Sequence, residues 1–288
     1  MSVELNQEFM DEDFHEPIPA RLTDEEYEDI RAFFENSEHW AYQYGSPSES
    51  TTDSPYYRRQ VQVILEGRYF HWVTNYALTR LVDEGFLKED LNTIGGVTIK
   101  FIHKRKVRNV KREIRRRVGL WELISNETMS KATGDHAELL TENMLLGCQF
   151  TIVQKHTNEF RGRIWTTTAH NLDFIVEKEG ESYGIEVKNT FPYMPREEFA
   201  IKVEMCQYLG IHPLFILRAA PYPQFEQMKG VGGRVVMFKT KVFPFGQQTL
   251  VSEIWRHMRL PVAVRSSFPL AVINQVKRIG ARPLDNKF

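Results

Sequence analysis

The chain has 288 residues, 42% hydrophobic and 26% charged, a length and composition that suit two soluble globular domains. No apolar run approaches the roughly 18–20 residues that a membrane span requires, and the acidic opening residues lack the features of a secretory signal, so we expect neither membrane contact nor secretion. Cysteine occurs only at Cys148 and Cys206, which excludes a disulfide scaffold and a four-cysteine zinc site and fits a cytoplasmic protein.

The formal net charge of −1 conceals a strong division along the chain. Residues 1–54 carry 15 acidic and 2 basic side chains, a balance of −13, whereas residues 55–130 carry 8 acidic and 15 basic ones, a balance of +7. The remaining residues, 131–288, have a balance of +5. A basic middle and C-terminal part predict a polyanionic partner, which the acidic N-terminal part would repel.

The N-terminal part begins with residues 1–22, which contain few apolar side chains and predict an acidic flexible arm. Thr23 and Glu26 then match a capping box, which predicts a helix that continues through Phe34. The small polar residues 45–55 predict a loop or linker.

The next part of the chain combines helical patterns with a two-stranded ribbon. Apolar side chains recur at helical spacing from Tyr56 to a break at Gly67, and again over residues 71–85. Residues 88–103 predict two strands around a double-glycine turn. Three helices followed by such a ribbon resemble a winged helix, and this resemblance implies an α+β DNA-binding domain over residues 23–103.

A dense basic segment follows the ribbon and predicts an amphipathic linker helix over residues 104–130, because Val107, Val110 and Ile114 keep a helical spacing beneath the charge. Phosphate contact is the favoured interpretation of this density. A merely solvated helix face, calmodulin-type binding and membrane-surface binding are the alternatives. The candidate DNA-binding residues are Lys104, Arg105, Lys106, Arg108, Lys111, Arg112, Arg115, Arg116 and Arg117.

The C-terminal residues, 131–288, alternate between helical and strand patterns, which is typical of an α/β domain with a mixed sheet flanked by helices. Helices are predicted over 134–147, 197–209, 248–259 and 268–279. Strands are predicted over 149–154, 171–177, 182–188, 213–218 and 234–239. The second and third of these strands are expected to pair through a short turn.

Charged side chains converge on that expected hairpin. Asp173 lies at the start of the first strand, and Glu186 and Lys188 alternate with aliphatic residues in the second strand, so they share one face. In a hairpin Asp173 reaches Glu186, and two converging carboxylates are costly unless a cation lies between them. Hard oxygen ligands suit Mg²⁺ or Mn²⁺, and Lys188 would position or activate a water.

This arrangement resembles the PD-(D/E)XK nuclease superfamily, the fold of restriction enzymes and archaeal Holliday junction resolvases. Asp173 is followed, after twelve intervening residues, by Glu186-Val187-Lys188, although Leu172 stands where the family pattern nominally has proline. Glu138 matches the acid on the preceding helix of the family. Gln207 lies on the helix that borders the site in relatives, where in some families a glutamine contacts DNA or the lysine.

The resemblance spans residues 131–265 and implies a restriction-endonuclease-like domain over residues 131–288. It implies a magnesium or manganese ion held by Asp173, Glu186, the Val187 carbonyl and Glu138. The catalytic residues that it implies are Glu138, Asp173, Glu186, Lys188 and Gln207.

Each of these residues also has a purely structural interpretation. Glu186 and Lys188 could form surface salt bridges on an exposed strand, Asp173 could be a turn residue, and Glu138 could be an ordinary solvated helix position. His136 is as typical of packing or capping as of a site. The scattered histidines indicate no zinc site.

Together these patterns predict a Mg²⁺-dependent endonuclease of the restriction, repair or junction-cleaving type, which holds duplex DNA through a winged helix and a basic helix. The alternative is a non-catalytic DNA-binding regulator on a nuclease-like scaffold, against which the intact Asp173, Glu186 and Lys188 argue. RNA stays open as a substrate. A homodimer stays open as well, since cutting both strands with one active site per chain often requires two chains.

Overall fold

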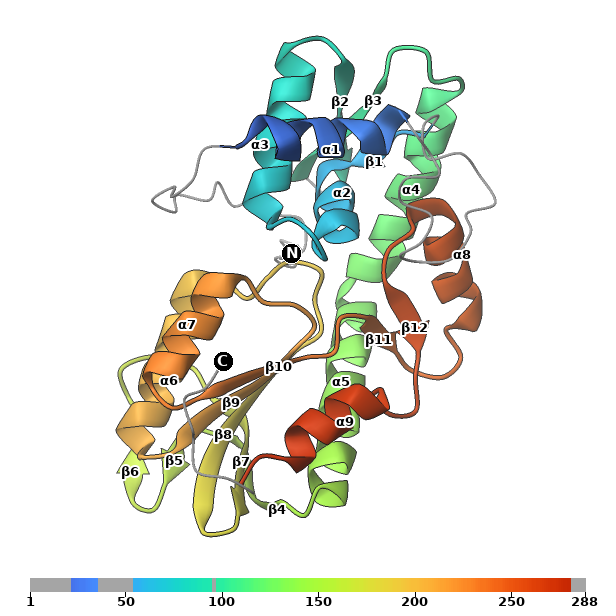
Figure 1. Ribbon diagram of the computed structural model, residues 1–288. Coiled ribbons are helices and arrows are strands. Elements are labelled where there is room, and N and C mark those ends of the chain that lie inside the picture. The colour runs from blue at the N-terminus through green and yellow to red at the C-terminus, as the bar shows by residue number, and fades with distance from the viewer. Residues whose placement is uncertain (1–21, 36–53, 95–96, 281–288) are drawn as a thin grey trace. The chain divides into compact units, whose positions relative to one another are not determined.

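The computed structural model describes residues 22–35, 54–94 and 97–280. The chain divides into two compact units: unit 1 comprises Met1–Ser130 and Gln247–Val262, and unit 2 comprises Lys131–Gly246 and Ala263–Phe288. Both units combine helices with strands, so the expected mixed α/β class is confirmed at that level (Figure 1). Within the described ranges, no helix has both the length and the apolar character needed to cross a membrane.

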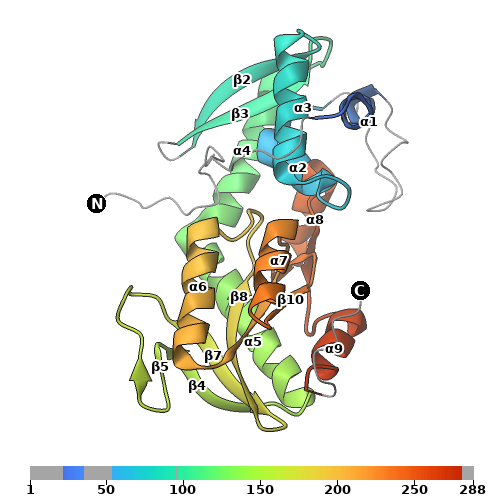
Figure 2. The same cartoon turned by 60° about the vertical axis from the view of Figure 1, so that its left-hand side comes forward.

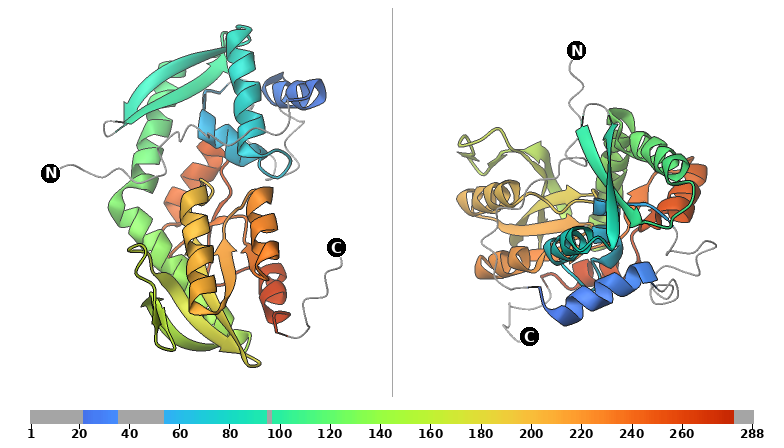
Figure 3. Two further views of the ribbon diagram at one scale, coloured as in Figure 1. Left: turned by 90° about the vertical axis from the view of Figure 1, so that its left-hand side faces the viewer. Right: turned by 90° about the horizontal axis from the view of Figure 1, so that it is seen from above.

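Unit 1 combines helices with a small antiparallel sheet. Its described elements are α1 (Asp24–Glu35), β1 (Tyr56–Tyr57), α2 (Arg58–Leu65), α3 (His71–Asp83), β2 (Leu87–Ile94), β3 (Val97–Lys104), α4 (Val110–Ser125) and α8 (Gln248–Met258). Strands β2 and β3 pair from Leu87 opposite Lys104, and β1 pairs with the other edge of β3. The two long strands form the ribbon beside α3 in Figure 3.

The first helix of unit 1 begins as the sequence predicts. The Glu26 backbone N–H donates to Thr23 Oγ1, and the Thr23 N–H donates to Glu26 Oε2, which are the reciprocal bonds of a capping box. The apolar face of α1 then packs into one core with α2, α3, β2 and β3. Burial of these aromatic and aliphatic side chains is the main favourable contribution to folding of the unit.

The basic segment differs from the single linker helix predicted over residues 104–130. Strand β3 extends to Lys104, and a turn follows in which the Val107 N–H donates to the Lys104 carbonyl. Asn109 then adopts a left-handed conformation, with φ of 56°, immediately before α4, a conformation that asparagine tolerates better than most residues. A separate helix, α5, begins at Glu127. The segment is therefore a strand end, a turn and two helices.

Helix α8 belongs to unit 1 although it is far away in the sequence. The Gln60 side chain on α2 donates to the Met258 carbonyl at 2.7 Å, and Arg116 on α4 forms an ion pair with Glu253 at 3.8 Å. The sequence pattern placed residues 247–262 in the C-terminal domain, whereas they pack with unit 1. A contact across such a separation leaves no local sequence signal.

Unit 2 is built around a five-stranded mixed sheet with the order β10-β9-β8-β7-β4. Strands β4, β7 and β8 are antiparallel neighbours, whereas β8, β9 and β10 run parallel. The elements, with α5 starting just before the unit boundary, are α5 (Glu127–Gly147), β4 (Thr151–Thr157), β5 (Glu159–Phe160), β6 (Arg163–Ile164), β7 (Leu172–Lys178), β8 (Glu181–Lys188), α6 (Arg196–Leu209), β9 (His212–Leu217), α7 (Tyr222–Gly230), β10 (Arg234–Met237), β11 (Lys241–Phe243), β12 (Val262–Val264) and α9 (Leu270–Lys277).

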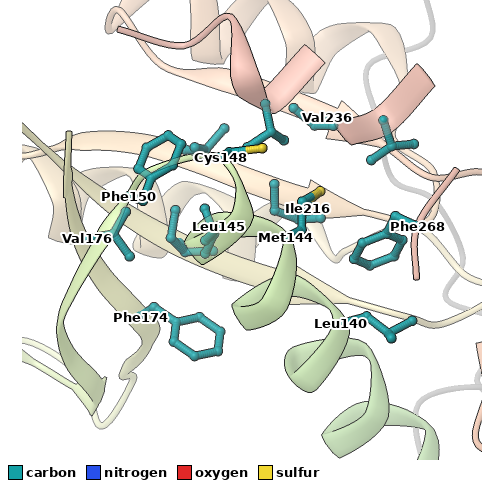
Figure 4. Close-up of a cluster of buried hydrophobic side chains, with 14 of the residues drawn as sticks. Leu140, Met144, Leu145, Cys148, Phe150, Phe174, Val176, Ile216, Val236 and Phe268 are labelled. Carbon is teal, nitrogen blue, oxygen red and sulfur yellow. The ribbon is translucent and has the colours of Figure 1, made fainter. Parts of the chain in front are cut away.

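The sheet of unit 2 has two apolar faces because side chains alternate along its strands. Leu214 and Ile216 of β9 pack with α5 and α9, whereas Phe215 and Leu217 pack with α6 and α7. Figure 2 shows α6 and α7 on one side of the sheet and α5 on the other, and Figure 4 shows the core on the α5 side. A charged side chain in the middle of β8 is consequently buried, as Glu186 is, whereas the edge strand β4 leaves Lys155 exposed.

The hairpin predicted over residues 171–189 is confirmed as β7 and β8. The strands β5, β6, β11 and β12 were not predicted, because segments of two or three residues are too short to establish a periodicity. Helix α7 was not predicted either. Residues 1–21 of the predicted arm, residues 45–53 of the predicted linker and the Gly95-Gly96 turn lie outside the described residues.

Candidate functional site

Three neighbouring strands of unit 2 bring polar side chains to one level of the sheet. Lys155 pairs with Phe174 and Thr157 with Leu172, so His156 on β4 lies opposite Asp173 on β7. The β7–β8 ladder ends at Phe174 opposite Ile185, so the next position along it places Asp173 level with Glu186. The predicted approach of Asp173 to the second strand is therefore present, and His156 adds a side chain from a third strand.

Asp173 lies where the β7–β8 ladder ends. Its Oδ2 accepts a hydrogen bond of 2.7 Å from the Val187 backbone N–H, so the carboxylate takes the place of a backbone partner. Val187 thus contributes its N–H to the site. Burial raises the pKa of the Asp173 carboxyl, and the Val187 N–H and the nearby Lys202 oppose this shift.

Glu138 on α5 joins His156 and Asp173 in a group with metal-ligand chemistry. One potential ligand atom from each of the three residues lies within 4.8 Å of the others, and His156 Nε2 is 3.7 Å from Glu138 Oε2. Burial raises the pKa of Glu138, and the negative charge of Asp173 raises it further. Two carboxylates and one imidazole are donors that suit Mn²⁺ and, through the oxygens, Mg²⁺.

Glu186 is almost completely buried, and its partner is a lysine that strand alternation does not reveal. Lys202 on α6 donates to Glu186 Oε2 at 2.6 Å and also donates to the Asn171 carbonyl. Burial and the charge of Asp173 raise the pKa of Glu186 to about 8, and Lys202 acts in the opposite direction. The cation that we expected between Asp173 and Glu186 is thus supplied, on the Glu186 side, by the chain itself.

A glycine permits the close approach of α6 to β8 that brings Lys202 to Glu186. Gly184 lies two residues before Glu186, so the two share a face of β8. A Cβ atom at Gly184 would stand 2.6 Å from Cys206 Sγ and 2.9 Å from Leu172 Cδ1. Any side chain at this position would push α6 away from the strand.

Lys188, the last residue of β8, forms a second ion pair with the same helix. Its Nζ donates to Glu198 Oε1 at 2.7 Å, and both side chains are partly exposed. Two residues along a strand span about 6.7 Å, and four residues along a helix rise about 6 Å. The spacing between Glu198 and Lys202 on α6 is therefore close to the spacing between Lys188 and Glu186 on β8, so each charge on the helix lies opposite its partner on the strand.

Gln207 and His136 lie apart from this group. Gln207 is exposed on α6, five residues beyond Lys202 and thus on a different face of the helix, so the structure does not bring it to Asp173 or Lys188. His136 on α5 is bound to the Arg265 carbonyl, with a distance of 2.8 Å from Nε2. This contact fits the packing interpretation of His136.

His156, Glu198 and Lys202 were missed by sequence reasoning for different reasons. Glu198 and Lys202 have a detectable signal, since opposite charges four residues apart on a helix complement the charges two residues apart on the strand. His156 has none, because its left-handed φ of 47° breaks the alternation from which a strand residue's face is inferred.

The basic segment presents most of its charge to solvent. Arg105, Lys106, Arg108, Lys111, Arg112, Arg115 and Arg116 are exposed, and Lys104 is partly buried at the end of β3. Arg117 departs from the expectation: it is only 2% exposed, and its Nη1 donates to the carbonyl and to Oε2 of Glu113. Its place on the apolar side of α4 removes it from the candidate DNA-binding surface.

Comparisons with protein-family models, with curated proteins and with solved structures returned no match for this chain.

Proposed function

We propose that the protein is a divalent-metal-dependent endonuclease that hydrolyses phosphodiester bonds of DNA. The observation that carries this proposal is the convergence of Glu138, His156 and Asp173 within 4.8 Å, next to the buried Glu186 and the strand-end Lys188. The order of elements around these residues supports a PD-(D/E)XK nuclease fold for unit 2. The helices and ribbon of unit 1 support a winged-helix fold in the same way.

Phosphodiester hydrolysis requires metal binding and activation of a water, and different residues of the site would carry out these roles. A divalent ion bound at such a site lowers the pKa of a coordinated water and offsets negative charge on the phosphate. Glu138, His156 and Asp173 would hold the ion, and the Val187 N–H fixes the Asp173 carboxylate for that task. Lys188, oriented by Glu198, would donate to the attacking water or to a phosphate oxygen.

DNA affinity is assigned to the basic segment of unit 1. Cations such as Lys111, Arg112 and Arg115 are exposed on α4, and exposed cations on one element bind phosphates without reading sequence. Binding and cleavage thus depend on different residues. A change in the metal site should abolish cleavage and leave DNA affinity largely intact.

A second function has its own supporting observation. Glu186 and Lys188 each have an ion-pair partner within the chain, as a scaffold that binds no metal would also require. The alternative is therefore a non-catalytic DNA-binding regulator. It predicts DNA binding with no cleavage of any substrate.

The deciding experiment is a cleavage assay on linear, supercoiled and four-way-junction DNA, with Mg²⁺, with Mn²⁺ and with EDTA. We expect cleavage with either metal, none with EDTA, and none for Asp173→Asn. The matched control is Glu177→Gln on the same strand, since Glu177 contacts Arg161 and Ser182 instead of the site. Cleavage by Asp173→Asn at the parental rate would show that the site is assigned wrongly, and DNA binding without cleavage on every substrate would favour the regulator.

A further inference from the structure

Lys202 lies beside Glu186, a carboxylate that the family resemblance implies as a metal ligand. We propose that Lys202 takes the place of a second divalent ion next to Glu186, so that the site binds a single ion, held by Glu138, His156 and Asp173. This inference rests on the proposed function, because it specifies the metal stoichiometry of the same site.

The geometry places the ammonium group where a second ion would bind. Lys202 Nζ is 2.6 Å from Glu186 Oε2, and both side chains are at most 7% exposed. The Asn171 carbonyl is a further acceptor for the same Nζ. Because like charges repel strongly in a poorly solvated environment, a divalent ion on Glu186 would have to displace this ammonium group.

The net charge of the site also favours the binding of a single divalent ion. In the deprotonated state that binds metal, the four carboxylates of Glu138, Asp173, Glu186 and Glu198 are offset by the two ammonium groups of Lys188 and Lys202. The residual charge of −2 with a neutral His156 is the charge that one divalent ion balances. A second ion would leave an excess charge of +2 beside the buried pair of Glu186 and Lys202, which is costly.

The position of Lys202 is fixed by the packing of its helix. The Glu198–Lys188 pair anchors α6 one turn before Lys202, and Gly184 allows the helix to lie close to β8. Lys202 is therefore held by the fold in its place beside Glu186.

The proposal is tested by counting Mn²⁺ ions on the full chain, using electron paramagnetic resonance of free Mn²⁺ together with calorimetry. We expect one Mn²⁺ per chain for the parent protein. Asp173→Asn should weaken binding by at least about tenfold, since even the loss of a residue that only supports a ligand typically costs that much, and Glu186→Gln should weaken it far less. Two Mn²⁺ per parent chain, or a loss for Glu186→Gln as large as for Asp173→Asn, would overturn the proposal.

Replacing Lys202 itself gives the complementary test. Lys202→Met keeps an unbranched side chain, one atom shorter and without the charge, and should allow a second Mn²⁺ to bind, whereas Lys202→Arg should still bind one. A folded Lys202→Met that binds one Mn²⁺ contradicts the proposal. If Lys202→Met does not fold, the parent stoichiometry and the Glu186→Gln comparison decide.

Cleavage measured on the same samples separates this inference from the function on which it rests. Two bound Mn²⁺ with metal-dependent cleavage would overturn the single-ion inference alone. A parent protein that binds no Mn²⁺ and cuts no DNA would overturn the proposed function and the inference together.

Discussion

At the scale of single residues, Asp173 is held in place by one hydrogen bond from the Val187 N–H. Asparagine in place of Asp173 retains an oxygen that can accept this bond but loses the negative charge. The Asp173→Asn variant therefore separates the charge of the side chain from its structural role. An effect of this change on cleavage reports chemistry at the site, and an effect on folding is expected to be small.

His156 should determine which metal the site prefers. Mn²⁺ accepts an imidazole nitrogen more readily than Mg²⁺, which is the harder cation, so His156→Asn should weaken Mn²⁺ binding more than Mg²⁺ binding. Asparagine suits the left-handed φ of 47° at this position. Calorimetry with each metal measures the difference.

The matched control for this change is His212→Asn. His212 is also a strand histidine paired with a glutamate, Glu181, but it lies on β9, level with the start of β8 and away from Glu186. The His212→Asn variant should leave the affinities for Mn²⁺ and Mg²⁺ unchanged. Equal losses of Mn²⁺ and Mg²⁺ affinity in His156→Asn would mean that the imidazole is not a ligand.

The candidate site was predictable from sequence as far as a single hairpin extends. Asp173, Glu186 and Lys188 follow from strand alternation and from the turn between the strands, and Glu138 came from a family resemblance. Lys202 was not predictable by this reasoning, because its contact with Glu186 depends on how α6 packs over β8. The cation that we expected between two carboxylates was therefore assigned to a metal alone.

At the scale of elements, the packing of α6 on β8 controls the site, and Gly184 controls that packing. Gly184→Ala places a methyl group within 3 Å of Cys206 Sγ and Leu172 Cδ1. We expect the free energy of unfolding to fall by about 1–3 kcal/mol, the usual cost of overpacking, together with weaker cleavage. Urea denaturation measures the first effect.

A glycine with free space provides the control for this prediction. Gly134 lies inside α5, and a Cβ there would meet nothing within 4 Å. Gly134→Ala should raise stability by roughly 0.5–1 kcal/mol, because alanine is the better helix former. Equal effects of the two substitutions would contradict the role given to Gly184.

Helix α4 should dominate the salt dependence of DNA binding. Replacing Lys111, Arg112 and Arg115 by alanine removes exposed cations without touching the buried side of the helix. Each lost phosphate contact should reduce the slope of log K against log salt by about 0.9. Fluorescence anisotropy across a salt series measures this slope.

The control for the α4 variant is a triple variant that removes three positive charges from unit 2. Lys229, Arg234 and Lys277 are exposed there, and their replacement by alanine should leave the slope nearly unchanged. If both triple variants lower the slope equally, net charge controls binding, and α4 has no special role.

At the scale of the whole molecule, the sequence predicted the class, the hairpin and most of the longer elements, since these depend on local periodicity. It did not predict that residues 247–262 belong to unit 1. That assignment depends on contacts such as Gln60 with Met258, which connect parts of the chain with no shared local pattern. The start of the basic helix was placed too early for a different, local reason, because charge density concealed the strand that ends at Lys104.

The stability of the whole chain should depend on pH through the carboxyl groups of Glu138, Asp173 and Glu186. Burial raises the pKa of Glu186 from 4.5 to about 8, and the pKa values of Glu138 and Asp173 also rise. A raised pKa in the folded state stabilises the fold below the unfolded value, and this contribution is lost as the pH rises through the folded value. The metal-free protein should therefore lose stability between about pH 5 and pH 8, because each tenfold change in proton affinity corresponds to about 1.4 kcal/mol.

Divalent metal should reduce this loss, because it binds the deprotonated carboxylates. Thermal unfolding followed at several pH values, with EDTA and with Mn²⁺, gives both curves. Glu186→Gln should flatten the metal-free curve. A melting temperature that rises from pH 5 to pH 8 in EDTA would contradict the raised pKa values of these carboxyl groups.

The late position of α8 in the sequence has a consequence for how the protein is made. A ribosome synthesises the chain from residue 1 onward, and N-terminal domains usually fold first. The Gln60 side chain of unit 1 donates to the carbonyl of Met258 at the end of α8. Unit 1 therefore cannot be completed until every strand of the five-stranded sheet has been translated. Nascent chains arrested before residue 247 should accordingly expose the surfaces of α2 and α4 that α8 later covers, and would be the form most open to chaperones.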